Sequence, residues 1–213
     1  MVGWHIVGLT LVGLLVGELA WWAARGLAPE GEQRPPSQQH AWATRLLSAT
    51  LFGLAGWRFG GDSRLWFVLP YSVVLLIILV MDLQHRLIVD KVTFPAMAVV
   101  LVASPFWPGL GLPSALLGGL FALVIFGVLL AIAWRIHPDA LGMGDLKLAV
   151  LIGLASGFPL VLRALLAGFL AGGIIALALL ALRLKSMKDT MPYGPGLVAG
   201  AFYALFVLST PGA

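Results

Sequence analysis

The chain has 213 residues, of which 61% are hydrophobic and only 10% are charged. Soluble domains carry about 25% charged residues, so this composition excludes a soluble globular protein and indicates an integral membrane protein. The absence of cysteine excludes disulfides, thiolate metal sites and cysteine nucleophiles, and the net charge of +4 does not predict a nucleic-acid partner because the basic residues lie between apolar segments.

Eight apolar segments follow one another along the chain: residues 3–24, 44–57, 65–83, 91–110, 113–134, 146–159, 160–182 and 190–211. A helix that crosses a bilayer needs about 20 apolar residues. The second and sixth segments are shorter, and only Gly157-Phe158-Pro159 separates the sixth from the seventh, so a count of seven is the alternative. The pattern predicts an all-α, polytopic membrane helix bundle of about eight transmembrane helices, forming a single membrane-embedded domain over residues 1–213.

The first segment contains an acidic residue, Glu18, about two helical turns before its end. Ionisable residues inside membrane segments are costly and are usually paired or functional. Glu18 is therefore expected either to pair with a basic side chain or reach the interface, or to contact substrate or another helix. Residues 25–43, which follow this segment, are rich in Pro and Gln and predict a flexible cytoplasmic loop.

The basic residues predict how the chain crosses the membrane, because cytoplasmic loops are enriched in Lys and Arg. With eight segments, one side of the membrane receives ten of the 13 basic residues, namely Arg25, Arg34, Arg45, Arg86, Lys91, Arg135, Lys147, Arg183, Lys185 and Lys188. The other side receives Arg58, Arg64 and Arg163. The first side is predicted to be cytoplasmic, which places both termini outside.

Two aspartates stand at the ends of predicted membrane segments. Asp82 ends the third segment and Asp145 begins the sixth, and both ends fall on the predicted cytoplasmic side. Two carboxyl groups a few ångströms apart share one proton, so the ionised acid can take a proton from water while the protonated acid donates to a peptide carbonyl. The two acids predict an aspartic protease at the membrane surface, and no cofactor or metal is expected.

Two glycines, Gly142 and Gly144, precede Asp145 in a Gly-x-Gly-Asp sequence. Glycine allows tight turning and the close approach of another backbone, as a bound substrate strand requires. The alternative is a glycine-rich connection between two helices that contains an incidental aspartate, because short motifs often occur by chance.

Three further residues lie close to the aspartates in the sequence. Lys147 is expected either to hold a counter-charge near the pair or to reach the lipid headgroups. Asp90 is expected to order the loop after Asp82 or, preferably, to cap the fourth helix. His85 is interpreted as an exposed loop histidine without a role.

The start of the last segment is interrupted by Pro192, Gly194 and Pro195. Non-helical backbone at membrane depth is tolerated only against protein or water. These residues are therefore expected either to line the active-site cleft or simply to begin a helix.

Taken together, the motifs resemble those of the bacterial type IV prepilin peptidases, membrane aspartic proteases of the Gly-x-Gly-Asp class. The matching residues are Met81-Asp82-Leu83, Leu87-Ile88-Val89-Asp90, Gly142-Met143-Gly144-Asp145-Leu146-Lys147-Leu148 and Met191-Pro192-Tyr193-Gly194-Pro195. The resemblance implies that Asp82 and Asp145 are catalytic, and that the chain cleaves prepilins or pseudopilins after a glycine just ahead of their hydrophobic helix. It also implies a place in the bacterial inner membrane, with the active site facing the cytoplasm.

The chain departs from the family pattern in three respects. Many members carry paired Cys-x-x-Cys motifs in a cytoplasmic domain between the first two segments, whereas residues 25–43 contain no cysteine. Those larger members also methylate the new N-terminus with S-adenosylmethionine, and the resemblance leaves this second activity open. Val89 stands where the family often has proline, and Glu18 and Trp21 replace polar residues usual near the first segment.

Two other functional classes are compatible with a polytopic chain of this composition. In a proton-coupled transporter, Asp82 and Asp145 would relay protons and the Gly/Pro breaks would mark the substrate site. That class predicts polar residues near mid-span and repeat symmetry between the halves, and the sequence shows neither. In a non-enzymatic component of a pilus or secretion machine, both aspartates could be replaced without loss of function.

Overall fold

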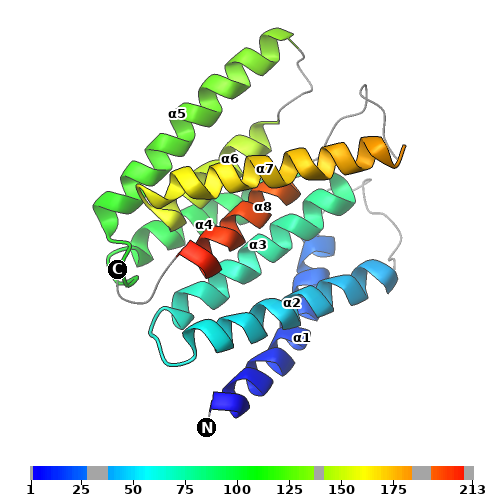
Figure 1. Cartoon of the computed structure of the whole chain (residues 1–213), viewed down its shortest axis with the longest axis vertical. Coiled ribbons are helices and arrows are strands. Elements are labelled where there is room, and N and C mark those ends of the chain that lie inside the picture. The colour runs from blue at the N-terminus through cyan, green and yellow to red at the C-terminus, as the bar shows by residue number, and fades with distance from the viewer. Residues whose placement is uncertain (1, 28–37, 137–141, 184–192, 209–213) are drawn as a thin grey trace. The chain divides into compact units, whose positions relative to one another are not determined.

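Regular secondary structure is helical throughout the residues that the structure describes, which confirms the all-α prediction for that part of the chain (Figure 1). The structure is a computed structural model and describes residues 2–27, 38–136, 142–183 and 193–208. Its contacts divide the chain into two compact units, Met1–Val92 and Thr93–Ala213, called here the N-terminal unit and the C-terminal unit.

The described residues form eight α-helices and one π-helix. The N-terminal unit contains α1 (Val2–Leu27), α2 (Gln38–Phe59) and α3 (Leu65–His85), and α4 (Asp90–Ala103) begins at its end. The C-terminal unit contains α5 (Leu112–Ile136), α6 (Met143–Ser156), α7 (Leu160–Ala181), α8 (Gly194–Tyr203) and the π-helix η1 (Ala204–Leu208). Eight α-helices agree with the count of eight apolar segments rather than seven.

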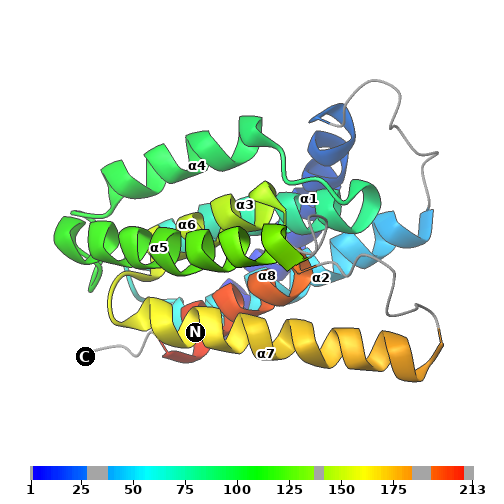
Figure 2. The ribbon, with the colours of Figure 1, turned by 90° about the horizontal axis from the view of Figure 1, so that it is seen from above.

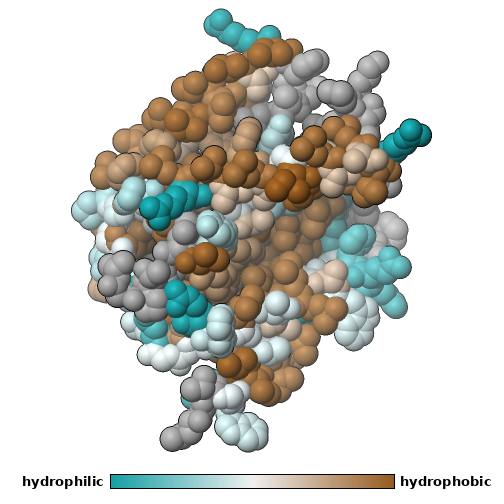
Figure 3. Space-filling view, in the orientation of Figure 1, coloured by the Kyte–Doolittle hydropathy of each residue, from teal (hydrophilic) through white to brown (hydrophobic). Residues whose placement is uncertain are grey.

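Four of the helices are long and apolar enough to cross a bilayer: Gly3–Leu27 in α1, Leu65–His85, Leu112–Ile136 and Leu160–Ala181. They make the chain a multi-pass membrane protein. Large hydrophobic side chains cover the outer surfaces of α5 and α7, where Figure 3 shows continuous apolar surface. Such surfaces suit contact with lipid rather than water.

In the N-terminal unit, α1 and α2 pack with their backbones in close contact. A Cβ atom built on Gly13 would lie 2.8 Å from the Cα of Ala49, and one built on Gly17 would lie 2.7 Å from the Cα of Arg45. Small residues at this spacing allow membrane helices to approach closely. Helix α3 contacts both members of this pair, so its orientation in the unit depends on how α1 and α2 are registered.

In the C-terminal unit, α6 packs against α5, α7 and α8, and its residues Leu148, Ala149, Leu151 and Ile152 are fully buried. Helices α5 and α6 lie side by side (Figure 2). At their contact, a Cβ built on Gly153 would overlap the Gly118 carbonyl oxygen, so the two backbones lie directly against each other.

The break between α6 and α7 occurs at the predicted position. Gly157 has a φ of 68°, a backbone conformation that favours glycine. The following Phe158 donates its backbone N–H to the carbonyl oxygen of Ser114 at 3.0 Å and accepts a 3.0 Å hydrogen bond from the Ser114 hydroxyl. These bonds attach the turn to the start of α5, which is why the two apolar segments form separate helices.

Candidate active site

Asp82 lies in the last turn of α3 and is buried, with 7% of its surface exposed. The helix ends at Arg86, which adopts the left-handed conformation (φ 55°) and donates its N–H to the Asp82 carbonyl oxygen at 2.9 Å. A left-handed residue after the last turn is a common way to end a helix. The main chain of Asp82 is therefore part of the helix end, while its carboxyl group lies in a buried setting.

The residues on either side of Asp82 are anchored in one hydrophobic cluster. Val80 and Met81 pack with Trp21 and Ala24 of α1 and Ala41 of α2, and each of these five side chains is buried. Partly buried side chains around the cluster are Leu27, Ile77 and Val89. Because Val89 comes after the turn and Met81 before it, the cluster holds the chain on both sides of Asp82.

Asp145 is the third residue of α6 and is half-buried. Gly142, the N-cap residue, is extended, with φ −91° and ψ 153°. Its N–H donates to Oδ2 of Asp145 at 3.1 Å, and the Asp145 N–H donates to the Gly142 carbonyl oxygen at 3.1 Å. This reciprocal pair fixes the carboxylate at the helix N-terminus, where the helix dipole favours a negative charge.

Among the described residues, none lies so close to position 142 that only a glycine would fit there. A Cβ built there would lie 3.5 Å from Asp145 Oδ2, which is an ordinary van der Waals contact. Its φ of −91° is open to any residue. Gly144 is the second residue of α6. Within the described part of the chain, a small side chain at position 142 would therefore fit in contact with the carboxylate.

Lys147 contacts an aromatic side chain of its own unit. Its Nζ lies 5.2 Å from the ring centroid of Phe94, in a cation–π arrangement. Phe94 belongs to α4, so this contact connects the N-terminal parts of α4 and α6. The sequence reasoning did not consider this aromatic partner, because the two residues are far apart in the chain.

Glu18 is paired with a basic side chain, which is one of the roles that the sequence predicted for it. Its Oε2 forms an ion pair with Nε of Arg45 on α2, and its Oε1 accepts a 2.9 Å hydrogen bond from Nε1 of Trp22. The Arg45 guanidinium lies 4.7 Å from the ring centroid of Trp42. The acid in the first segment therefore joins α1 to α2.

The interpretation of His85 as an exposed loop residue was wrong. His85 is the last residue of α3, and both of its ring nitrogens are buried without a hydrogen-bond partner among the residues that the structure describes. Sequence reasoning missed this because the surroundings of the last helical turn depend on tertiary packing. His85 lies three residues after Asp82 and therefore on the same face of the helix as this buried residue. That spacing was the available signal for the burial of His85.

Asp90 is exposed and is the first residue of α4, so its charge lies in the first helical turn, where negative charge is favourable.

Pro192 lies outside the described residues. Gly194 and Pro195 are the first two residues of α8, which confirms that this motif begins a helix. A cavity of about 150 Å³ nearby is lined by Phe126, Leu129, Ala133, Gly168, Phe169, Tyr193 and Leu197. Tyr193 and Leu197, but neither Gly194 nor Pro195, border this cavity.

The two aspartates belong to different units, so their approach to each other stays a prediction. Among the described residues, His, Asp and Glu side chains form no group of three that could hold a metal ion.

The sequence profile of the Type IV leader peptidase family matches residues 69–177, a stretch that contains both Asp82 and Asp145. The chain belongs to this family. The resemblance drawn from the motifs is therefore confirmed. No solved structure matches the chain.

Individual relatives agree with this assignment. The Prepilin leader peptidase/N-methyltransferase of Pseudomonas putida is 28% identical over 161 residues, which cover 74% of this chain and 55% of the relative. The protein of the same name from Bacillus subtilis is 29% identical, covering 76% of this chain and 64% of the relative. Leader peptidase HopD of Escherichia coli is 30% identical over 146 residues, covering 66% of this chain and 92% of that protein. The chain thus spans between about half and two thirds of the first two relatives and most of the third.

Proposed function

We propose that the chain is a membrane aspartic endopeptidase that removes the leader peptide from type IV prepilins or pseudopilins, with Asp82 and Asp145 as its catalytic pair. The observation that carries this proposal is the family match, which includes both acids within residues 69–177. The local settings of the acids support it. Asp82 lies in the last turn of one helix and Asp145 in the first turn of another, and such positions suit chemistry at a membrane surface.

The proposed reaction needs one proton shared between the two carboxyl groups. The ionised acid removes a proton from water, whose oxygen attacks the carbonyl carbon of the scissile peptide. The protonated acid donates to the carbonyl oxygen and stabilises the tetrahedral intermediate. When the C–N bond breaks, the leaving amine takes a proton from the acid that received it from water. A hydroxyl of the intermediate returns its proton to the other acid as the carboxyl product forms, and the shared-proton state is restored.

The proposed topology has eight crossings, with α2, α4, α6 and α8 crossing in addition to the four long apolar helices. Under this topology the end of α3 and the start of α6 face the cytoplasm, together with ten of the 13 basic residues. Asp82 and Asp145 then lie at the same membrane boundary of the inner membrane. That boundary is where the charged leader of a prepilin meets its apolar helix.

The exposure of Gly142 supports binding of an extended substrate next to Asp145. A strand that approaches this residue meets a backbone without a side chain, beside the carboxylate that accepts the Gly142 N–H. Close approach of a substrate backbone is a usual reason for glycine at a site.

The test is co-expression of a prepilin with the full chain or with Asp82→Asn or Asp145→Asn, followed by gel shift of the leader peptide. Either substitution is expected to lower the cleavage rate roughly 10²- to 10⁴-fold, because it removes an acid–base group. Asp62→Asn is the matched control, because Asp62 pairs with Arg64 in the turn before α3 and is expected to leave cleavage unchanged. Normal processing by either active-site variant would refute the proposal. The mass of the product's N-terminus reports methylation in the same experiment.

A further inference from the structure

The acidic residue of the first membrane helix lies in a polar network between α1 and α2. Glu18 accepts a hydrogen bond from Trp22 and forms an ion pair with Arg45, whose guanidinium stacks over Trp42. The Glu18 and Arg45 side chains are 34% and 28% exposed, so the pair is partly shielded. An unpaired carboxylate inside an apolar segment is costly, and the ion pair offsets that cost.

The ion pair is located beside one of the close backbone contacts between the two helices. Gly17 precedes Glu18, and a Cβ on Gly17 would overlap the Cα of Arg45. The glycine contact sets the distance between α1 and α2 but provides no directional bond between them. The ion pair of Arg45 on α2 with Glu18 on α1 is directional and so defines the register of one helix on the other, while the hydrogen bond from Trp22, also on α1, orients the Glu18 carboxylate.

The next turn of α1 carries the surface against which Asp82 is positioned. Trp21 and Ala24 are 5% and 0% exposed, and they pack with Met81, the residue before Asp82. Ala41, one turn before Arg45 on α2, completes this surface from the other helix. A change in the α1–α2 register would therefore move the packing partners of Met81 directly.

We propose that Glu18 and Arg45 are positioning residues for Asp82. They act by fixing the α1–α2 register next to the hydrophobic cluster in which Trp21 packs with Met81. This inference rests on the proposed peptidase function for its kinetic consequences. Both residues lie outside the stretch that matches the family profile, so the family assignment does not account for them. They give the N-terminal segment of this chain a specific task in the reaction.

The kinetic test compares Arg45→Gln, Arg45→Lys and the double variant Glu18→Gln/Arg45→Gln in the full-length protein. Arg45→Gln is expected to lower kcat roughly 10- to 100-fold with little change in KM, because a small misplacement of a catalytic group has an effect of this size. The shape of the pH–kcat profile should also change, since the aspartate pair titrates jointly. A variant that only lowers the amount of folded enzyme would reduce the amplitude at every pH without changing that shape.

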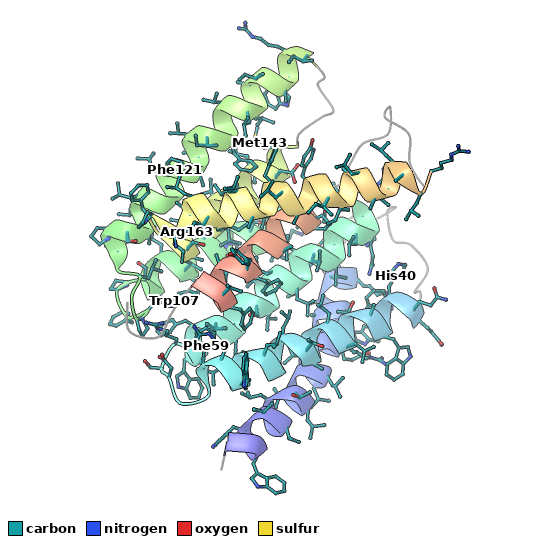
Figure 4. The ribbon with its side chains drawn as sticks, in the orientation of Figure 1. His40, Phe59, Trp107, Phe121, Met143 and Arg163 are labelled. Carbon is teal, nitrogen blue, oxygen red and sulfur yellow. The ribbon has the colours of Figure 1, made fainter. Side chains whose placement is uncertain are left out.

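Rescue gives the second kinetic criterion. Arg45→Lys retains the charge and should recover part of the rate, and the double variant should be more active than Arg45→Gln, because it no longer contains an unpaired carboxylate. Arg163→Gln is the control, because this exposed arginine lies on α7 (Figure 4). An unchanged kcat and pH profile in Arg45→Gln, or a double variant no more active than Arg45→Gln, would overturn the proposal.

A structural readout separates this proposal from the peptidase assignment. The chain has no cysteine, so Leu83→Cys, at a 56% exposed position beside Asp82, introduces a single thiol. Its rate of maleimide labelling in detergent is expected to change at least severalfold when Arg45→Gln is added, and to be unaffected by Arg163→Gln. An unchanged rate would refute positioning even if prepilin is cleaved. A changed rate without any prepilin cleavage by the unsubstituted chain would support positioning and refute the proposed function.

Discussion

The two units hold their aspartates by different means. In the N-terminal unit, Asp82 is located through its neighbours: Met81 is fully buried against Trp21 and Ala24, and the Asp82 main chain closes the end of α3. In the C-terminal unit, the Asp145 carboxylate is itself bonded, through the 3.1 Å hydrogen bond from Gly142. Packing is spread over several side chains, whereas the hydrogen bond acts at one atom. The position of Asp82 should therefore depend on remote apolar residues, and that of Asp145 on its own helix start.

The largest difference is expected from truncating one buried side chain in each unit. Met81→Ala and Leu151→Ala each remove a fully buried side chain and should each lower the free energy of unfolding by about 2–5 kcal/mol. Met81→Ala should in addition reduce the prepilin cleavage rate per folded molecule, because it displaces the residue next to Asp82. Thermal unfolding in detergent and specific activity measure the two effects. Equal specific activities for the two variants would show that the cluster does not position Asp82.

A smaller effect is expected at the start of α6. Gly142→Ala retains the N–H that donates to Asp145 and places its Cβ in ordinary contact, so stability should change little. Cleavage should fall about tenfold, equivalent to about 1.4 kcal/mol, if a substrate strand lies against this position. Gly153→Ala is the contrasting variant, since its Cβ would overlap the Gly118 carbonyl and lower stability. Full activity in Gly142→Ala would argue against a substrate strand at this position.

The smallest expected effect concerns His85. Its two buried ring nitrogens lack hydrogen-bond partners among the described residues, so His85→Leu should raise the free energy of unfolding by about 1 kcal/mol. The same variant should cleave prepilin more slowly, because unpaired buried polar groups persist mainly where function requires them. His40→Leu, at an exposed position in the first turn of α2 (Figure 4), should alter neither quantity. Unchanged cleavage by His85→Leu would leave the buried imidazole without a catalytic connection.

Much of this architecture follows from the sequence because its signals are local. The apolar segments predicted the helices, Gly157-Phe158-Pro159 predicted the break between α6 and α7, and the spacing of Gly142 and Asp145 suits a bonded helix start. The fourth helix ended earlier than expected, at Ala103 rather than residue 110. Residues 104–111 are apolar enough to be counted in the segment, but Pro105 and Pro108 do not allow a helix to continue there. Instead Gly109 and Gly111 have positive φ values, and Gly111 donates its N–H to Ser104 at 3.1 Å.

The parts that the sequence could not predict depend on contacts between distant residues. Glu18 had two possible roles until its partner was located, because Arg45 lies on another helix 27 residues away. Lys147 likewise finds Phe94 on a different helix. The burial of His85 depends on what surrounds the end of α3. Hydropathy and spacing describe each helix by itself, so they contain no information about which side chains meet across helices.

The contact of Gly118 with Gly153 has a mechanical consequence. Because backbone meets backbone there, no flexible side chain can absorb relative sliding of α5 and α6. Relative sliding of α5 and α6 would bring these backbones into overlap, so a displacement of α6 is expected to move α5 with it. Spin labels on the lipid-facing surface of α5 would then report a displacement of α6.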